Sequence, residues 1–221
     1  DHPNIARFVT FDAGARPKPI LVMELVEGPN IERLLETNDL TMARALMLLE
    51  GVATGLEAMH AIGVGHLDVK PSNIIVRQSG GGLESPVLVD FGLAGRHMRP
   101  GCGTAEYGAP EVWGIHPEGV TPTPLTADMY SFGCFAFEVL TGETLFDAPN
   151  EVALISAHLT HDGLPAPLKR LRDDRRGARV AEVLRHCLRK SPRDRATASE
   201  LRAELRALGE ELGEGPWPLG A

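Results

Sequence analysis

The order of the predicted elements, a few short strands followed by many helices, predicts an α+β protein. Near the start, residues 5–14 and 18–28 are rich in branched and aromatic residues and each run closes at a glycine, which predicts two strands. Further on, residues 126–142 are apolar almost all round, which predicts a buried central helix. Of the 221 residues, 43% are hydrophobic, so the chain can bury a substantial core.

The first helices are indicated by their caps and by apolar spacing. Residues 30–36 are expected to form a short helix. Residues 40–63 are expected to form a long one, with Thr41 as its N-cap and Gly63 at its end. The apolar positions of the long helix share one face: Leu46, Leu49, Val52, Leu56 and Met59.

The later elements follow the same signals. Short strands are expected at 73–76 and 86–90, separated by a Gly/Ser-rich loop at 77–85. Amphipathic helices are expected at 178–190 and 197–212. The chain shows no internal repeat.

Composition limits the class of protein and its compartment. The net charge of −8 argues against a nucleic-acid-binding surface. Cys102, Cys134 and Cys187 lie far apart, and an odd, unclustered set of cysteines indicates a reducing compartment, so we expect a cytoplasmic protein. No apolar run reaches the roughly 18 residues that a membrane span needs, so no membrane segment is expected in this chain.

The stretch "GHLDVKPSNIIV" at 65–76 gathers polar side chains just before a predicted strand. Pro71 fixes its own backbone and biases Lys70 away from helix, so this is a loop from which Asp68 and Asn73 point into one space. Asp90 follows a second apolar strand. Two acids and an amide form an oxygen-rich site that suits magnesium and phosphate, and Lys70 adds a positive charge for a phosphate oxygen.

Five features occur in a fixed order along the chain: "HLDVKPSN" at 66–73, "DFG" at 90–92, "GTAEYGAPE" at 103–111, "DMYSFG" at 128–133, and Arg195 in "SPRDRAT". With them the chain resembles the eukaryotic-type (Hanks-type) serine/threonine protein kinases, of the kind also found in bacteria. The resemblance implies a protein-kinase-like fold, mainly its helical C-terminal lobe with two strands of the N-terminal lobe. It also implies transfer of the γ-phosphate of ATP to serine or threonine hydroxyls of a protein substrate, with Mg2+ as a cofactor.

The resemblance assigns roles to the polar residues singled out above. Asp68 would orient the acceptor hydroxyl and take its proton, and Lys70 would contact the transferring phosphoryl group. Thr104 would bridge Asp68 and Lys70, a pairing that the family uses for alkyl hydroxyls. Asn73 and Asp90 would hold magnesium.

The resemblance also assigns residues to nucleotide binding and to the interior of the fold. Met23 resembles the residue beside the adenine, the backbones of Glu24 and Val26 resemble the hinge that hydrogen-bonds it, and Ile75 would lie under the ring. Glu111 is expected to pair with Arg195. Four residues resemble the internal spine that stacks between the lobes: Phe8, His66, Phe91 and Asp128.

The first departure from the family pattern is Leu67, where most members carry an arginine that receives a phosphate on the activation segment. Leucine cannot pair with a phosphate. The segment from Asp90 to Glu111 contains no serine, and its hydroxyl residues are Thr104 and Tyr107. We therefore predict an enzyme that phosphorylation of this segment does not switch on.

The second departure concerns three parts of a full kinase: the Gly-rich loop, the strand lysine and the helix glutamate. In the family they precede the motif "HPNI", which here occupies residues 2–5, so the given sequence does not contain them. We expect a fragment of a longer kinase rather than a truncated gene product, and we expect residues 1–221 on their own to transfer phosphate poorly or not at all. The alternative is a pseudokinase or scaffold module that binds protein partners without catalysis.

The predicted organisation has three parts. Residues 1–27 form the end of the small lobe and the hinge, 28–208 the large lobe, and 209–221 a Gly/Pro-rich tail. His158 and His161 lie three apart with no third ligand evident, so a metal site is not indicated there, and both are expected at the surface.

Overall fold

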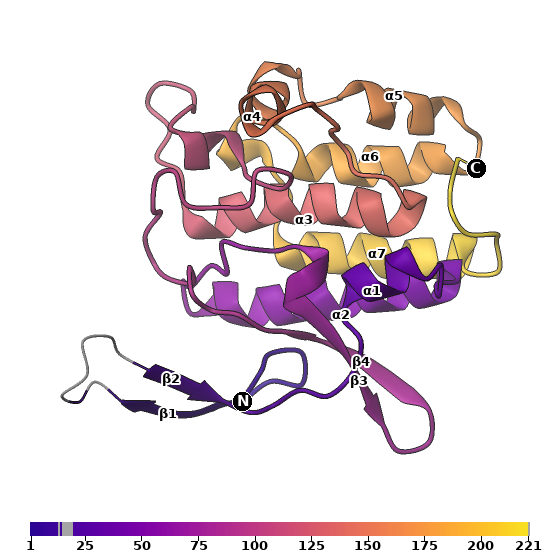
Figure 1. Cartoon of the computed structure of the whole chain (residues 1–221). Helices are drawn as coiled ribbons and strands as arrows, with labels where there is room; N and C mark the ends of the chain where they lie inside the picture. The colour runs from indigo at the N-terminus through magenta and orange to yellow at the C-terminus, as the bar shows by residue number, and fades with distance from the viewer. Residues whose placement is uncertain (13, 15–19, 221) are drawn as a thin grey trace.

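A computed structural model describes residues 1–12, 14 and 20–220 and confirms the α+β class (Figure 1). A body of helices carries two separate sheets, each an antiparallel pair of neighbouring strands. The strands are β1 (Phe8–Asp12), β2 (Ile20–Met23), β3 (Ile74–Ser79) and β4 (Leu83–Leu88). The helices are α1 (Ile31–Glu36), α2 (Met42–Ala61), α3 (Pro124–Thr141), α4 (Glu151–Thr160), α5 (Ala166–Asp173), α6 (Gly177–Cys187) and α7 (Ala198–Leu212). Short 3₁₀ turns are η1 (Pro71–Asn73), η2 (Pro110–Trp113) and η3 (Pro192–Asp194).

Helix α3 forms the centre of the helical body, as its apolar sequence predicts. Its side chains are buried on nearly every face, and Tyr130 and Phe135 are completely buried. Helices α2 and α6 pack against α3, and α7 packs along α2 (Figure 1). The helix begins with a capping box between Thr123 and Thr126, which satisfies free backbone donors of the first turn. Although α3 is strongly apolar, no helix in the described ranges combines the length and hydropathy needed to cross a membrane.

The long predicted helix is present as α2. The Thr41 side chain accepts a hydrogen bond from the Arg44 amide, as an N-cap should, and Gly63 follows the helix with a φ of 72°. The positions predicted to share one face are all buried: Leu46, Leu49, Val52, Leu56 and Met59. This face packs against α7 and α3, so the apolar periodicity indicated the correct side of the helix.

The hairpin of β1 and β2 projects from the helical body (Figure 1). Both strands were expected from the sequence, but their apolar side chains are unusually open. Phe8 is 57% exposed and Phe11 is 55% exposed. The hairpin therefore contributes little to the core, which lies among the helices.

The Gly/Ser-rich loop predicted at 77–85 is shorter in the structure than the sequence indicated, so the predicted extent is wrong. Strands β3 and β4 continue into it, and Gln78 pairs with Glu84 and Ser79 with Leu83. The turn is confined to Gly80–Gly82, where the last two glycines have positive φ. Polar residues misled the prediction because this end of the hairpin lies in water, where a ladder needs no apolar side chains.

Helices α4 and α5 have no counterpart in the sequence-based prediction. In α4, Val152 is 78% exposed while the polar His158 is completely buried, so the apolar pattern does not reveal the buried face. Helix α5 is short and begins at a proline-bounded turn. Both helices owe their place to tertiary packing rather than to a strong local signal.

The residues after α7 lie against the end of α3. Helix α7 runs from Ala198 to Leu212, which confirms the helix predicted at 197–212. Beyond it, the Trp217 indole donates to the Val139 carbonyl at 2.8 Å, and the Leu219 amide donates to the Leu140 carbonyl at 2.9 Å. The Gly/Pro-rich tail is thus attached to the helical body.

Candidate active site

The loop between α2 and β3 is held by one completely buried acid, Asp128 of α3. Its Oδ2 accepts from the His66 amide at 2.7 Å and lies 2.9 Å from His60 Nε2, and its Oδ1 accepts from the Leu67 amide at 2.6 Å. Leu67 has a φ of 64°, a left-handed conformation that leucine rarely adopts. The bonds to Asp128 offset this strain and fix the direction of the next residue, Asp68.

Asp68, Lys70 and Thr104 form a closed triangle of polar contacts. Thr104 Oγ1 donates to Asp68 Oδ1 at 2.7 Å and accepts from Lys70 Nζ at 2.8 Å, while Lys70 Nζ lies 2.9 Å from Asp68 Oδ2. The Asn73 amide nitrogen donates to Asp68 Oδ2 at 2.8 Å and to its backbone oxygen at 2.9 Å. Thr104 comes from a separate loop, so two distant segments meet at the Asp68 carboxylate.

The surroundings of Asp68 favour its ionised form. Partial burial by itself raises the pKa of this carboxyl, but the hydrogen bonds from Lys70, Thr104 and Asn73 together bring it below its ordinary value. Asp68 is therefore a carboxylate at neutral pH, and it can accept a hydrogen bond from an adjacent hydroxyl group.

Asn73 and Asp90 are brought to the same edge by the β3–β4 hairpin. The Val89 amide donates to the Asn73 carbonyl at 3.0 Å, so Asp90 directly follows a residue bonded to Asn73. Asp90 has a φ of 60°, and its Oδ1 accepts from the Gly92 amide at 3.1 Å. Asn73 uses its side-chain nitrogen toward Asp68, and no hydrogen bond among the described residues uses its side-chain oxygen, so that oxygen is available as a ligand.

The donor set fits magnesium better than a transition metal. The described residues hold no group of three or more His, Cys, Asp or Glu side chains that could bind a metal ion. An amide oxygen from Asn73 and a carboxylate from Asp90 are the oxygen ligands that Mg2+ takes, and magnesium sites commonly use one or two protein ligands with phosphate and water.

Three of the four predicted spine residues meet in the structure. The rings of His66 and Phe91 lie edge to face with centroids 5.3 Å apart, and Asp128 holds the His66 amide. His66 Nε2 lies 3.0 Å from the Val89 carbonyl, and His66 is completely buried, which agrees with a structural role. Phe8 lies apart from these three, in β1, where every residue is exposed, and is 57% open to solvent.

The residues predicted to contact a nucleotide lie where β2 leads into the helical body. Met23 ends β2, and the Glu24 amide donates to the Arg7 carbonyl at 2.9 Å. Val26 and Ile75 belong to one small apolar cluster outside the main core. Among the described residues, no hydrogen bond uses the Val26 backbone amide, so this group is available to a ligand.

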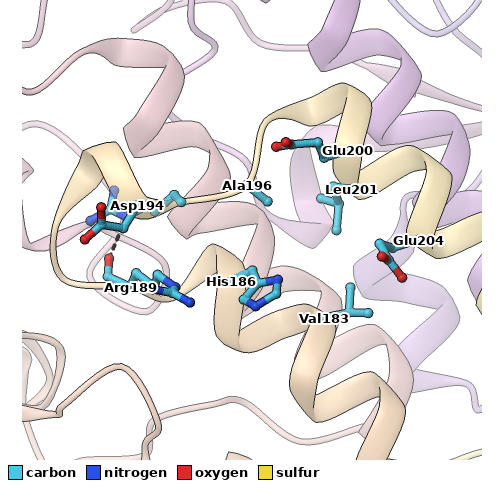
Figure 2. A pocket seen from close by; sticks show the side chains of 9 residues that line it. Val183, His186, Arg189, Asp194, Ala196, Glu200, Leu201 and Glu204 are labelled. Carbon is cyan, nitrogen blue, oxygen red and sulfur yellow. Dashed lines mark hydrogen bonds between the residues drawn. The ribbon is translucent and has the colours of Figure 1, made fainter.

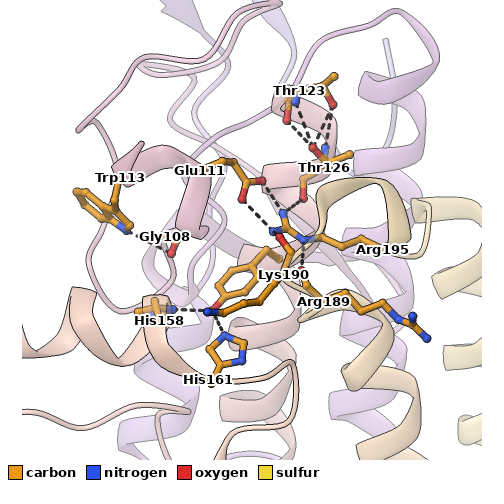
Figure 3. Close-up of polar contacts among 11 residues, drawn as sticks. Gly108, Glu111, Trp113, Thr123, Thr126, His158, His161, Arg189, Lys190 and Arg195 are labelled. Atoms are coloured by element: carbon orange, nitrogen blue, oxygen red, sulfur yellow. Dashed lines mark hydrogen bonds and ion pairs between the residues drawn. The ribbon is translucent and has the colours of Figure 1, made fainter. Parts of the chain in front are cut away.

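The loop from 103 to 111 is anchored to α3 and to the chain after α6. The Tyr107 hydroxyl donates to Glu138 Oε2 at 2.7 Å, a contact that no sequence signal indicated. Glu111 and Arg195 form the expected pair through two bonds of 2.5 and 2.9 Å, with both side chains completely buried (Figure 3).

The prediction that His158 and His161 lie at the surface is wrong for His158, whereas His161 is partly exposed. His158 is completely buried, and His158 Nδ1 and His161 Nε2 lie 2.9 and 2.8 Å from the hydroxyl oxygen of Tyr130 (Figure 3). The partner of both rings is 28 or more residues away in the chain, so no local pattern could have revealed the contact. His116, by contrast, is exposed.

We expect the free energy of unfolding to fall as the pH is lowered from about 6.5 to about 4. Burial lowers the pKa of both His158 and His161 from 6.5 to about 4, helped at His161 by the charge of Lys190. The unfolded chain therefore binds protons in this range that the folded chain does not, so stability is complete above pH 6.5 and is lost as the pH drops. The loss is up to about 3 kcal/mol per histidine.

Urea denaturation of the protein at pH 7.5 and pH 4.5 measures this difference. A double variant, His158→Gln with His161→Gln, should show a much smaller change between the two pH values. His116→Gln is the matched control, since that ring is exposed, and it should behave like the wild type. An unchanged difference in the double variant would show that other groups cause the acid sensitivity.

A separate hollow of about 450 Å³ lies between α6 and α7 (Figure 2). It contains none of the predicted site residues, and it carries charges of both signs. The ionisable residues that line it include His186, Arg189, Asp194, Glu200 and Glu204. The polar convergence at Asp68, and not this hollow, is the candidate active site.

Two curated protein kinases are similar to this chain over most of its length. Serine/threonine-protein kinase PkaA of Streptomyces coelicolor is 34% identical over 224 residues, which cover 96% of this chain and 38% of that protein. Serine/threonine-protein kinase PknB of Mycobacterium tuberculosis is 31% identical, covering 93% of this chain and 33% of that protein. The chain thus spans between a third and two fifths of the length of these two relatives.

The fold and the family model give the same result. The chain is similar to a crystal structure of the Rad53 kinase domain and SCD2 with a TM-score of 0.69 at 24% identity, covering 93% of this chain and 73% of that one. A second Rad53 structure, in complex with AMPPNP, gives a TM-score of 0.67. The model of the protein kinase domain matches residues 1–205. This chain therefore belongs to the protein kinase family.

Proposed function

We propose that the chain is the catalytic part of a serine/threonine protein kinase, which transfers the γ-phosphate of ATP to hydroxyls of a protein substrate. The observation that carries the proposal is the triangle of Asp68, Lys70 and Thr104, with Asn73 bonded to the same carboxylate. It combines a general base, a cation and a hydroxyl anchor within one hydrogen-bonded unit. The curated relatives named above are serine/threonine kinases, which supports the same function.

In this proposal Asp68 orients the acceptor hydroxyl and takes up its proton as the oxygen attacks phosphorus. Lys70 offsets the negative charge on the transferring phosphoryl group. Thr104 keeps both side chains in register, because its hydroxyl both donates to Asp68 and accepts from Lys70. Catalysis would come mainly from this positioning and from electrostatics.

ATP is the proposed phosphoryl donor. Met23, Glu24 and Val26 would line the adenine from the β2 side, and Ile75 would lie under the ring from β3, since Val26 and Ile75 already share a cluster. Asn73 and Asp90 would hold Mg2+, which supplies charge neutralisation at the phosphates when bound. The Rad53 kinase domain has a similar fold, and its structure in complex with AMPPNP supports the proposal that this chain also binds a nucleotide.

The acceptor specificity follows from Thr104. We expect phosphoserine and phosphothreonine, and little phosphotyrosine, because the Thr104 bridge holds the base close to the loop that resembles the substrate-docking segment and suits a short alkyl hydroxyl. Phosphoamino-acid analysis of products made by the intact protein tests this. Predominant phosphotyrosine would contradict the assignment.

The alternative is a pseudokinase or scaffold module. The exposed apolar side chains of β1 and β2 favour it, since such surfaces commonly contact other proteins. The two functions are separated by replacing Asp68 in the intact protein. A kinase would lose phosphoryl transfer, whereas a scaffold would show no such transfer before the change and would retain its partners after it.

We expect activity that does not require phosphate on the segment from Asp90 to Glu111. Leu67 is buried and cannot receive a phosphate, and the hydroxyls of Thr104 and Tyr107 are both engaged, with Asp68 and Glu138. The segment is also held without phosphate. Gly65 and Gly95 bond to each other at 2.9 and 3.0 Å, and the Arg99 guanidinium donates to the Gly92 carbonyl at 3.2 Å.

The measurement compares phosphatase-treated and mock-treated intact protein, with mass spectrometry of residues 90–111 to confirm dephosphorylation. The activity should change by less than about 2-fold, because Leu67 stands where an arginine would pair with a phosphate, and without that pair a phosphate on the segment would not order it. Thr104→Val, treated in the same way, shows whether any residual effect passes through that hydroxyl. The alternative is a phosphate received by Arg96 or Arg99, which would appear as a large loss of activity that rephosphorylation of the segment restores.

A further inference from the structure

A series of hydrogen bonds runs from the start of the α4–α5 loop to α3 and back to α4. Its direction is set by one backbone donor: the Gly163 amide donates to His161 Nδ1 at 2.9 Å. Since a backbone N–H can only donate, His161 Nδ1 must accept and carries no hydrogen. The neutral His161 ring therefore has its hydrogen on Nε2. That nitrogen lies 2.8 Å from the Tyr130 hydroxyl oxygen and therefore donates to it.

The hydroxyl of Tyr130 passes the direction on. Because it accepts from His161, its own hydrogen is free to point to His158 Nδ1, 2.9 Å away (Figure 3). His158 is then an acceptor at Nδ1 and, as a neutral ring, carries its hydrogen on Nε2. The Arg195 guanidinium lies over the Tyr130 ring at 4.9 Å, and Lys190 and Asp162 are the other charged groups beside His161.

The last nitrogen of the series, His158 Nε2, has no hydrogen-bonding partner of good geometry among the described residues, although the side chain is completely buried. Burial lowers the pKa of this ring, and the neighbouring backbone carbonyls of Glu106 and Ala105 act to raise it. Phe146 covers His158 with ring centroids 4.3 Å apart, which keeps the ring in place. A buried N–H without a partner is rare in folded proteins, so its orientation toward two carbonyls is informative.

Ala105 and Glu106 form the tip of a turn whose two ends are already fixed. The Thr104 carbonyl accepts from the Tyr107 and Gly108 amides at 3.1 and 2.9 Å. Thr104 is bonded to Asp68 and Tyr107 to Glu138. Among the described residues, Ala105 and Glu106 make no hydrogen bond, so the unpartnered nitrogen of His158 is a polar group available to this part of the turn.

We propose that Tyr130, His158 and His161 are positioning residues for the protein acceptor: their hydrogen bonds leave the His158 N–H free to bond to the carbonyls of Ala105 and Glu106 when an acceptor docks, which would fix the turn Thr104–Gly108. The proposal rests on the kinase function proposed above, because it assigns this turn to the acceptor side of the site. The contact from His158 tightens when an acceptor docks, as polar contacts at active sites commonly do. The Michaelis constant for the acceptor should depend on it, and that for ATP should not.

Two variants of one residue separate positioning from packing. In His158→Asn the side chain keeps an acceptor near the place of Nδ1 but loses the N–H at Nε2. The KM for a peptide acceptor should rise about 3- to 10-fold, the size expected for one neutral hydrogen bond, with the KM for ATP unchanged. His158→Gln restores an N–H near Nε2 and should recover most of the acceptor KM. Equal defects in the two variants, or a parallel rise of both KM values, would overturn the proposal.

A second readout needs no activity. Nitrogen-15 NMR of the imidazole rings in the intact protein at neutral pH should show the hydrogen on Nε2 in both histidines, and the amides of Ala105–Gly108 should exchange about 3- to 10-fold faster in His158→Asn. If the protein shows no transfer to any acceptor, the proposed function fails, while these two measurements still decide on the hydrogen bonds. A hydrogen on Nδ1 of His158, or unchanged amide exchange, would overturn the inference.

Discussion

Replacing Asp68 by asparagine is expected to lower the kcat for phosphoryl transfer about 10²- to 10⁴-fold, the contribution typical of a positioned general base. The amide can still accept from Thr104 at one atom, but its NH2 group then faces two donors, Lys70 Nζ and the Asn73 amide nitrogen. The variant therefore loses the proton acceptor and also the register of Lys70. Steady-state kinetics of the intact protein with a serine- or threonine-containing acceptor measures the loss.

The control is an Asp→Asn change of the same size away from the site. Asp173 is 75% exposed at its side chain and pairs only loosely with Arg172 at 3.6 Å, so Asp173→Asn should keep the wild-type kcat. Thermal melting of both variants shows whether the fold is intact. Normal turnover by a folded Asp68→Asn protein would remove Asp68 from the proposed mechanism.

Replacing Arg195 by methionine is expected to destabilise the protein by about 3–5 kcal/mol, the usual result of leaving one member of a buried ion pair alone. Arg195 and Glu111 are both completely buried at their side chains. Arg195 also donates to the Thr126 and Arg189 carbonyls, each at 2.7 Å, so the change leaves several buried acceptors without a donor. Urea denaturation at neutral pH gives the free energy of unfolding.

Two further variants make this measurement specific. Arg206 pairs with Glu50 at 2.7 Å, but its side chain is 66% exposed, so Arg206→Met should cost at most about 1 kcal/mol. Changing both partners, Arg195→Met with Glu111→Leu, should recover part of the lost stability, since no charge is then buried unpaired. Equal losses in the Arg195 and Arg206 variants would mean that the buried pair has no special weight.

Much of the candidate site could be predicted from short stretches of sequence because its geometry is local. Asp68 and Asn73 are five residues apart in the sequence, and Pro71 lies between them in the loop. The Asn73 side chain bonds to Asp68, as this spacing suggests. The family motifs also related Thr104 to Asp68 across 36 residues, and the structure brings the two to 2.7 Å. The helix α2 followed from its cap and its apolar period.

By itself, then, the sequence determined the α+β class, the kinase resemblance, the long helices and the polar side chains around Asp68. Only the tertiary structure decided the positive φ of Leu67, which exists because Asp128, 61 residues later, accepts from its amide. The same holds for the burial of His158: the partner that makes a buried histidine tolerable, Tyr130, comes from another helix. A polar side chain shows its preference for water in the sequence, but whether the fold supplies a hydrogen-bonding partner in place of water depends on residues that are distant along the chain.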